Sequence, residues 1–115
     1  MARVRALIRA LPKDTVVVSG GARGVDQVAA DEALRCGLAT DIVPAAWARF
    51  GNMAGILRNT TIVERSDETV AFWDLVSRGT MDTVRKSVVA GHKVTVYGPQ
   101  GEVVPPSRWE WRNDD

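Results

Sequence analysis

Two short segments of the sequence combine glycine with arginine and hydroxyl side chains in a pattern that suits a phosphate group. The first, SGGARGVD at residues 19–26, directly follows an apolar run. Glycine allows positive φ and a close approach of the backbone to an anion, and the amides at a helix N-terminus favour negative charge. An arginine adds a forked donor. The predicted contacts in this first turn are Gly20, Gly21, Arg23 and Gly24, with Asp26 at the start of the following helix.

This first turn matches neither of the two common nucleotide fingerprints. The dinucleotide motif GxGxxG would need glycine where Ser19 stands, and no Gly-Lys-Ser/Thr follows as in a P-loop. A tight turn without a ligand is therefore as good an interpretation of the spacing alone.

A second turn, SRGT at residues 77–80, repeats the same residue types after a different apolar run. Ser77, Gly79 and Thr80 are candidate ligand contacts here, although Ser77 or Thr80 could simply cap the next helix, which contributes about 1 kcal/mol. Arg58 and Asn59 lie off the apolar face of a predicted helix and could reach an anion, or could form a solvated helix surface.

The rest of the chain predicts helices that alternate with strands. Apolar residues recur at helical spacing near residues 2–11, 25–36, 53–65 and 80–90, and β-branched or apolar runs mark strands at 15–19, 41–44, 68–74 and 93–97. In the first helix Arg3, Arg5 and Arg9 fall opposite the apolar face. Such alternation implies parallel strands joined by right-handed crossovers in a layered α/β sheet, with ligands beyond the carboxyl ends of the strands.

Composition limits the class of protein. With 115 residues, 45% apolar and 25% charged, the chain fits one ordinary globular domain, and a net charge of +1 gives no overall attraction to nucleic acid or an anionic membrane. Its single cysteine, Cys36, cannot form an intramolecular disulfide, and with one histidine, His92, it excludes a usual zinc site. No apolar run approaches the roughly 20 residues of a membrane span. We expect a cytoplasmic protein without a metal or cofactor.

Four segments in order, GGARGVD, PAAW followed by AGILRN, AFWDLVSRGT and HKVTVY, resemble the small SLOG-superfamily proteins related to YspA and YpsA. The resemblance covers about residues 1–97. The superfamily also contains the LONELY GUY phosphoribohydrolases and the DNA-processing protein DprA. The resemblance implies a three-layer Rossmann-like parallel sheet that binds nucleotides, nucleotide-derived signals or, in some branches, nucleic acid. A shift in composition after Gly98 to a proline-containing segment divides the chain into a domain at 1–98 and a C-terminal tail at 99–115.

The resemblance also suggests roles for individual residues. It places Gly20, Gly21, Arg23 and Gly24 in a phosphate-contacting turn, matches Arg58 to an arginine that engages the phosphoribosyl group in the hydrolase branch, and places Ser77, Gly79 and Thr80 in a second turn. Thr83 stands where hydrolase members carry the glutamate of a Gly-Thr-x-x-Glu pattern. Because cleavage of a glycosidic bond calls for a carboxylate, this difference weakens the enzyme interpretation.

A second difference from the superfamily is that its first strand is not found before the first helix. The gap could close by direct pairing of residues 15–19 with residues 70–73, or by a strand from elsewhere, such as the tail or a partner. Exposed apolar helix faces would favour a homodimer. The tail tryptophans Trp109 and Trp111 could cover a sheet edge or pack on a neighbouring subunit.

Three functions follow from these observations. The first is a nucleotide-binding module, a sensor or a sequestering protein, that holds a nucleotide or nucleotide-derived phosphate at the two turns. The alternative is a nucleotide phosphoribohydrolase, and the third is a nucleic-acid-binding protein, which the near-neutral charge disfavours.

Overall fold

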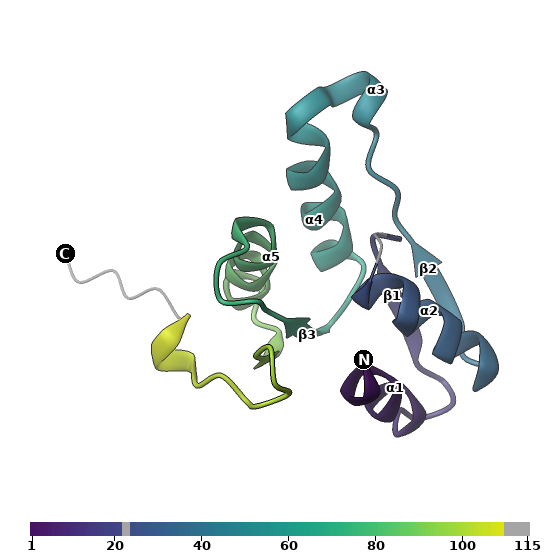
Figure 1. Ribbon diagram of the computed structural model, residues 1–115. Helices are drawn as coiled ribbons and strands as arrows, with labels where there is room; N and C mark the ends of the chain where they lie inside the picture. The colour runs from purple at the N-terminus through teal and green to yellow at the C-terminus, as the bar shows by residue number, and fades with distance from the viewer. Residues whose placement is uncertain (22–23, 110–115) are drawn as a thin grey trace.

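The computed structural model describes residues 1–21 and 24–109 and alternates helices with short strands (Figure 1). The helices are α1 (Ala2–Arg9), α2 (Val25–Arg35), α3 (Trp47–Phe50), η1 (Gly51–Met53), α4 (Ala54–Glu64), α5 (Arg78–Val89) and η2 (Pro106–Arg108). The strands are β1 (Val16–Ser19), β2 (Ala39–Ile42), β3 (Glu68–Phe72) and β4 (Lys93–Tyr97). None of the described helices has the length and apolar character needed to cross a bilayer.

The strands form two separate parallel pairs. In one, β1 pairs with β2, from Val16 opposite Ala39 to Ser19 opposite Ile42. In the other, β3 pairs with β4, from Glu68 opposite Lys93 to Phe72 opposite Tyr97. Parallel α/β pairing is therefore confirmed, but the described strands do not form the single layered sheet that the sequence predicted, because β1 and β3 are not paired with each other.

Several predicted elements differ from those observed, and β3, for example, ends at Phe72 rather than at residue 74. The first helix ends at Arg9 rather than at residue 11, just before Pro12. Strand β2 covers Ala39–Ile42 rather than 41–44, because Pro44 has no N–H to donate to a strand ladder. The segment around Trp47, predicted as a loop, forms the short helix α3. Local side-chain patterns located the first helix and β2 but misplaced their ends, and they missed α3.

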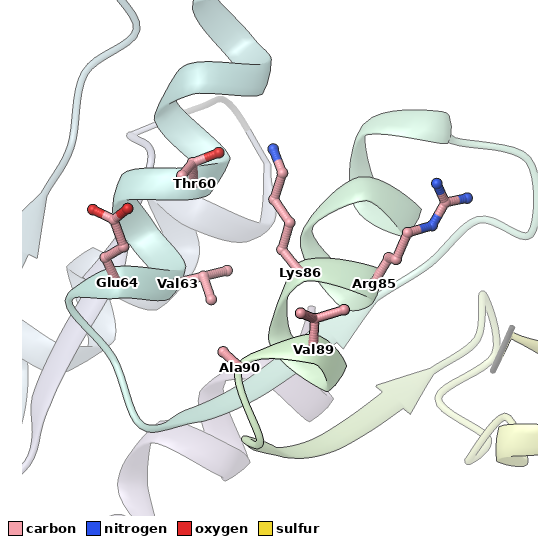
Figure 2. A pocket seen from close by; sticks show the side chains of 7 residues that line it. All are labelled: Thr60, Val63, Glu64, Arg85, Lys86, Val89 and Ala90. Atoms are coloured by element: carbon pink, nitrogen blue, oxygen red, sulfur yellow. The ribbon is translucent and has the colours of Figure 1, made fainter.

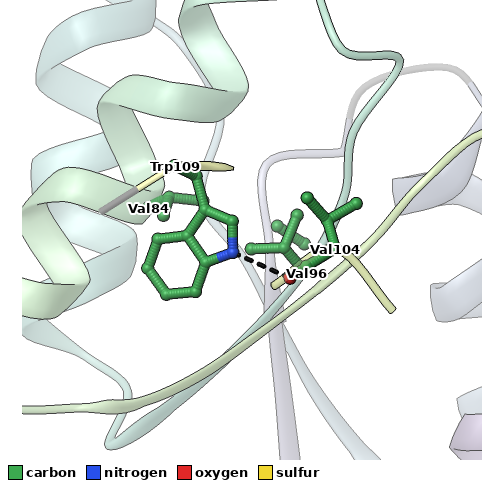
Figure 3. Packing of buried hydrophobic residues seen from close by; sticks show 5 residues of the cluster. Val84, Val96, Val104 and Trp109 are labelled. Atoms are coloured by element: carbon green, nitrogen blue, oxygen red, sulfur yellow. Dashed lines mark hydrogen bonds between the residues drawn. The ribbon is translucent and has the colours of Figure 1, made fainter. Parts of the chain in front are cut away.

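Each strand pair has its own hydrophobic cluster. Beside β1 and β2, the buried residues Ile8, Ala33 and Leu38 pack with half-buried neighbours that include Cys36. Beside β3 and β4, a larger cluster contains Ala71, Val84, Val96, Val104 and Trp109, with Trp73, Met81 and Val94 packed against it (Figure 3). Each strand pair thus packs on a cluster of its own, although Val16 of β1 and Ile42 of β2 remain about half exposed.

The beginning of the tail packs against β4. Val103 forms an antiparallel bridge with Tyr97, and the Val104 amide donates to the Val96 carbonyl at 2.8 Å. The Trp109 indole, 9% exposed, donates from Nε1 to the Val104 carbonyl at 3.0 Å (Figure 3). Trp109 therefore packs in a hydrophobic cluster of its own chain, while Val103 and Val104 lie along the edge of β4. Trp111 lies outside the described residues.

A buried carboxylate joins α1 to α2. Glu32 is 3% exposed and accepts from Arg5 Nη1 at 3.0 Å and from Arg9 Nε at 3.1 Å. These two arginines, predicted to lie on the polar face of α1, thus bridge to the neighbouring helix. The hydrogen bonds from Arg9 and Arg5 hold the pKa of Glu32 below its usual value of 4.5.

We expect this ion cluster to make stability depend on pH. Because the pKa of Glu32 is lower in the folded state than in the unfolded state, its contribution is present above the unfolded value of 4.5 and is lost as pH falls through the lowered folded value. Urea denaturation at neutral pH and at about pH 3 should therefore show a larger loss for wild type than for Glu32→Gln. If wild type and Glu32→Gln lose the same unfolding free energy on acidification, Glu32 does not contribute to the pH dependence.

Candidate functional site

The first turn leads from β1 into α2 through backbone conformations that favour glycine. Gly21 has φ of +69° and Gly24, the N-cap of α2, has φ of +85°. The buried Gly20 donates its amide to Asp26 Oδ2 at 3.0 Å, so Asp26 closes the turn from within the first turn of the helix. Arg23, a predicted ligand contact in this turn, lies outside the described residues.

Arg58 of α4 reaches this first turn. Its Nη1 donates to the Gly20 carbonyl at 3.3 Å, and its side chain lies so close to Gly20 that a Cβ there would stand 2.8 Å from Arg58 Cδ. Arg58, predicted from the sequence as a ligand contact without a stated partner turn, thus contacts the backbone of the first turn. The absence of a side chain at residue 20 is what allows the approach.

Two buried polar atoms at this turn have no hydrogen-bond partner. They are Ser19 Oγ, at the end of β1, and Arg58 Nε, and no other buried side-chain nitrogen or oxygen of the described residues lacks one. Leaving a buried donor unsatisfied costs about 1–3 kcal/mol, so natural proteins place such groups where water or a ligand can meet them. Because both atoms lie at the end of β1, this turn is the candidate ligand site of the described residues.

Asn59, the next residue of α4, contacts the second turn instead. Its Nδ2 donates to the Gly79 carbonyl at 3.3 Å and to Asp82 Oδ2 at 3.2 Å. Asp82 also pairs with Lys86 at 2.8 Å. Adjacent residues of α4 thus connect the two predicted turns, and Asp82, which the sequence analysis did not include in the site, belongs to this network.

In the second turn the hydroxyl groups serve as a helix cap. Ser77 is the N-cap of α5, and its Oγ accepts from the Thr80 amide at 3.4 Å and from Thr80 Oγ1 at 3.2 Å. Gly79 lies inside the helix and is exposed, and a Cβ added there would meet nothing closer than Ser77 Oγ at 4.0 Å. The second turn therefore has the capping geometry that was the structural alternative, with open space beside Gly79.

Asp74 precedes this second turn and organises it. Its Oδ1 accepts from the Val76 amide at 3.0 Å and from the Ser77 amide at 2.7 Å, while Leu75 between them has φ of +74°. These two backbone hydrogen bonds, from Val76 and then Ser77, lower the pKa of Asp74. The sequence analysis missed this residue, although aspartate three residues before a serine N-cap is a signal for such a turn.

Two of the hollows in the described part of the chain bear on the site. The larger, of about 480 Å³, lies beside the carboxyl ends of β3 and β4 and includes Val25, the first residue of α2. The smaller, of about 290 Å³, lies between α4 and α5, with Val63, Val89 and Ala90 on its apolar side (Figure 2). None of the predicted site residues that the structure describes lines either of these two hollows, and the described residues contain no group of three His, Cys, Asp or Glu side chains that could hold a metal.

Fold and contacts together define an α/β protein whose two strand-to-helix turns are linked by one helix. Searches against protein-family models, curated proteins and solved structures found no match to this chain.

Proposed function

We propose that this chain binds a nucleotide or nucleotide-derived phosphate at the first turn, as a sensor or a sequestering module, with Arg58 donating to the phosphate. The observation that carries the proposal is the pair of buried, unpartnered polar atoms at this turn, Ser19 Oγ and Arg58 Nε. A phosphate oxygen accepts hydrogen bonds from both a hydroxyl and a guanidinium.

The unpartnered groups at this turn, Ser19 Oγ and Arg58 Nε, can both donate, which favours an anion. The turn leads into the N-terminus of α2, an eleven-residue helix whose first amides and dipole attract negative charge. The carboxylate that lies here, Asp26, is already engaged by the Gly20 amide. The resemblance to the SLOG superfamily is what suggests a nucleotide rather than another phosphate ester.

Arg58→Ala should weaken AMP binding by about 10- to 150-fold, the range expected when a hydrogen bond to a charged group is lost. Adenosine, which has no phosphate to engage the guanidinium, should lose much less. Isothermal titration of both ligands measures this difference. Arg65→Ala is the matched control, because Arg65 ends the same helix and pairs with Asp41 on the surface at 3.1 Å.

A second variant moves Arg58 without removing it. A methyl group at Gly20 would stand 2.8 Å from Arg58 Cδ, so Gly20→Ala should displace this flexible side chain with little effect on thermal stability. Gly20→Ala should therefore weaken AMP as Arg58→Ala does, whereas Gly55→Ala, whose nearest contact is Trp47 at 3.4 Å, should not. If AMP binds both Arg58→Ala and Gly20→Ala with wild-type affinity, the site assignment is wrong.

One observation favours the alternative, a nucleotide phosphoribohydrolase. Asp82 provides a carboxylate one residue before Thr83 and is hydrogen-bonded to Asn59, next to Arg58. Incubation with AMP and analysis for released adenine tests for turnover. Hydrolysis that is lost in Asp82→Asn would support the enzyme, and binding of AMP without hydrolysis supports the sensor or sequestering module.

We also propose that the protein forms a homodimer through an apolar arm, residues 47–57. Of the fourteen exposed large apolar side chains among the described residues, five fall within these eleven residues: Trp47, Phe50, Met53, Ile56 and Leu57. With about half of each side chain exposed, the arm offers on the order of 500 Å², and two copies together reach the roughly 1,000 Å² that a specific interface needs.

Sedimentation velocity at micromolar concentration should therefore detect a dimer that Phe50→Glu converts to a monomer, because the charge would be buried in the interface. Val89→Glu is the matched control, since Val89 is 84% exposed but lies outside the arm. Equal sedimentation of both variants would exclude the arm as the interface.

A further inference from the structure

The larger hollow, of about 480 Å³, lies next to the first turn. Val25 lines it directly after Gly24, the N-cap of α2. Met1 lines it too, and its Cε lies 3.8 Å from where a Cβ on Gly24 would stand. A ligand whose phosphate binds at the first turn could therefore extend into this hollow past Gly24.

The planar side chains of Arg3 and Phe72 line the hollow, and both contact the ring of Tyr97. The rings of Phe72 and Tyr97 stack at a centroid distance of 5.2 Å with an angle of 22° between their planes. Arg3 holds its guanidinium carbon 5.3 Å from the centre of the Tyr97 ring. Of these three, Arg3 and Phe72 line the hollow. Aromatic rings and guanidinium planes are the surfaces on which nucleic-acid bases stack in proteins.

A polar group suited to a sugar lies at the same place. Asp74 lines the hollow, and both backbone amides that bind its carboxylate use Oδ1. Oδ2 can therefore accept hydrogen bonds, as an acidic side chain does from ribose hydroxyls in dinucleotide-binding proteins. The volume of the hollow falls within the roughly 300–1,000 Å³ typical of small-molecule sites.

We propose that this hollow holds the nucleoside part of the ligand, with the base stacked against Arg3 and Phe72 and the ribose hydroxyls bound by Asp74. The inference rests on the proposed function, since it assumes that the phosphate binds at the first turn. It adds that the site recognises a base, so that the ligand is a nucleotide with its base intact rather than a sugar phosphate.

The comparison that tests this inference is AMP against ribose 5-phosphate, which carries the same phosphate and sugar without the base. Stacking of one base corresponds to a factor of about 5 to 150 in affinity, so wild type should bind AMP tighter than ribose 5-phosphate by that factor. Arg3→Ala should reduce this ratio several-fold and leave the affinity for ribose 5-phosphate unchanged. Arg35→Ala, an exposed arginine at the far end of α2, is the control and should keep the wild-type ratio.

Asp74→Asn tests the sugar contact separately. It should weaken AMP more than it weakens 2′,3′-dideoxy-AMP, which lacks the hydroxyls that Asp74 would bind. Equal affinity of wild type for AMP and ribose 5-phosphate would overturn the base subsite while the proposed phosphate site stands. An Arg3→Ala variant that weakens both ligands alike would also overturn it, because Arg3 would then act on the phosphate. If neither ligand binds wild type, the proposed function itself fails.

Discussion

Replacing Trp109 by alanine is expected to lower the free energy of unfolding by about 3–5 kcal/mol, the usual cost of removing a buried large aromatic side chain. Trp109 is 9% exposed and packs with Val84, Val96 and Val104 in the cluster beside β3 and β4 (Figure 3). Its removal would leave a cavity and would also free the Val104 carbonyl, which accepts from the indole at 3.0 Å. Urea denaturation followed by far-ultraviolet circular dichroism measures the change.

Two variants separate the contributions of Trp109. Trp109→Phe keeps most of the packing and loses the hydrogen bond, so it should cost about 0.5–1.5 kcal/mol together with a smaller packing loss. Trp47→Ala removes the same side chain type from a site where it is 57% exposed and should cost about 0.5 kcal/mol or less at protein concentrations where the chain is monomeric. Similar losses for Trp109→Ala and Trp47→Ala would mean that residues 99–109 do not pack as described.

Gly21→Val is expected to destabilise the protein and to abolish AMP binding. Valine at φ of +69° is strained by about 1–3 kcal/mol, and its Cβ would stand 2.9 Å from Ile42 Cγ2, which adds an overpacking cost of about 1–3 kcal/mol. The side chain would also obstruct the approach of a phosphate to the backbone of the first turn. Urea denaturation and titration with AMP measure the two effects separately.

Gly37→Val is the matched control for this substitution. Gly37 has φ of +72°, almost the same as Gly21, but a Cβ there would meet nothing within 4 Å. The difference in unfolding free energy between the two variants therefore measures the contact with Ile42, and Ile42→Ala in the Gly21→Val background should recover part of it. If Gly37→Val loses AMP binding as completely as Gly21→Val, the loss would come from destabilisation and not from the site.

Stretches of sequence with a regular period predicted the elements well. A continuous β-branched run located β1, an apolar run located β4, and apolar residues at helical spacing located α2, α4 and α5, because these patterns depend on neighbours within one or two turns. Glycine likewise marked Gly21 and Gly24 as turn positions, and both have positive φ. These features depend on the local backbone, which the side chains next to it determine.

Contacts between distant residues were not predicted in the same way. The Glu32 carboxylate is 27 residues from Arg5, and Asn59 is 23 residues from Asp82. In the sequence, all four residues look like ordinary polar residues on the exposed face of a helix. Periodicity predicts which face a residue occupies, but not which other helix packs against that face. The cost of burying a charge becomes a constraint only after the two helices are packed.

Sequence patterns alone predict that this protein alternates helices with parallel-pairing strands and that glycines form the turn between β1 and α2. Only the tertiary structure decided that the strands divide into two pairs, that Arg58 and Asn59 reach different turns, and that Trp109 completes a core around β4. The physical reason is that turn and helix preferences act over a few residues, whereas strand pairing and the satisfaction of buried polar groups depend on which segments meet in space.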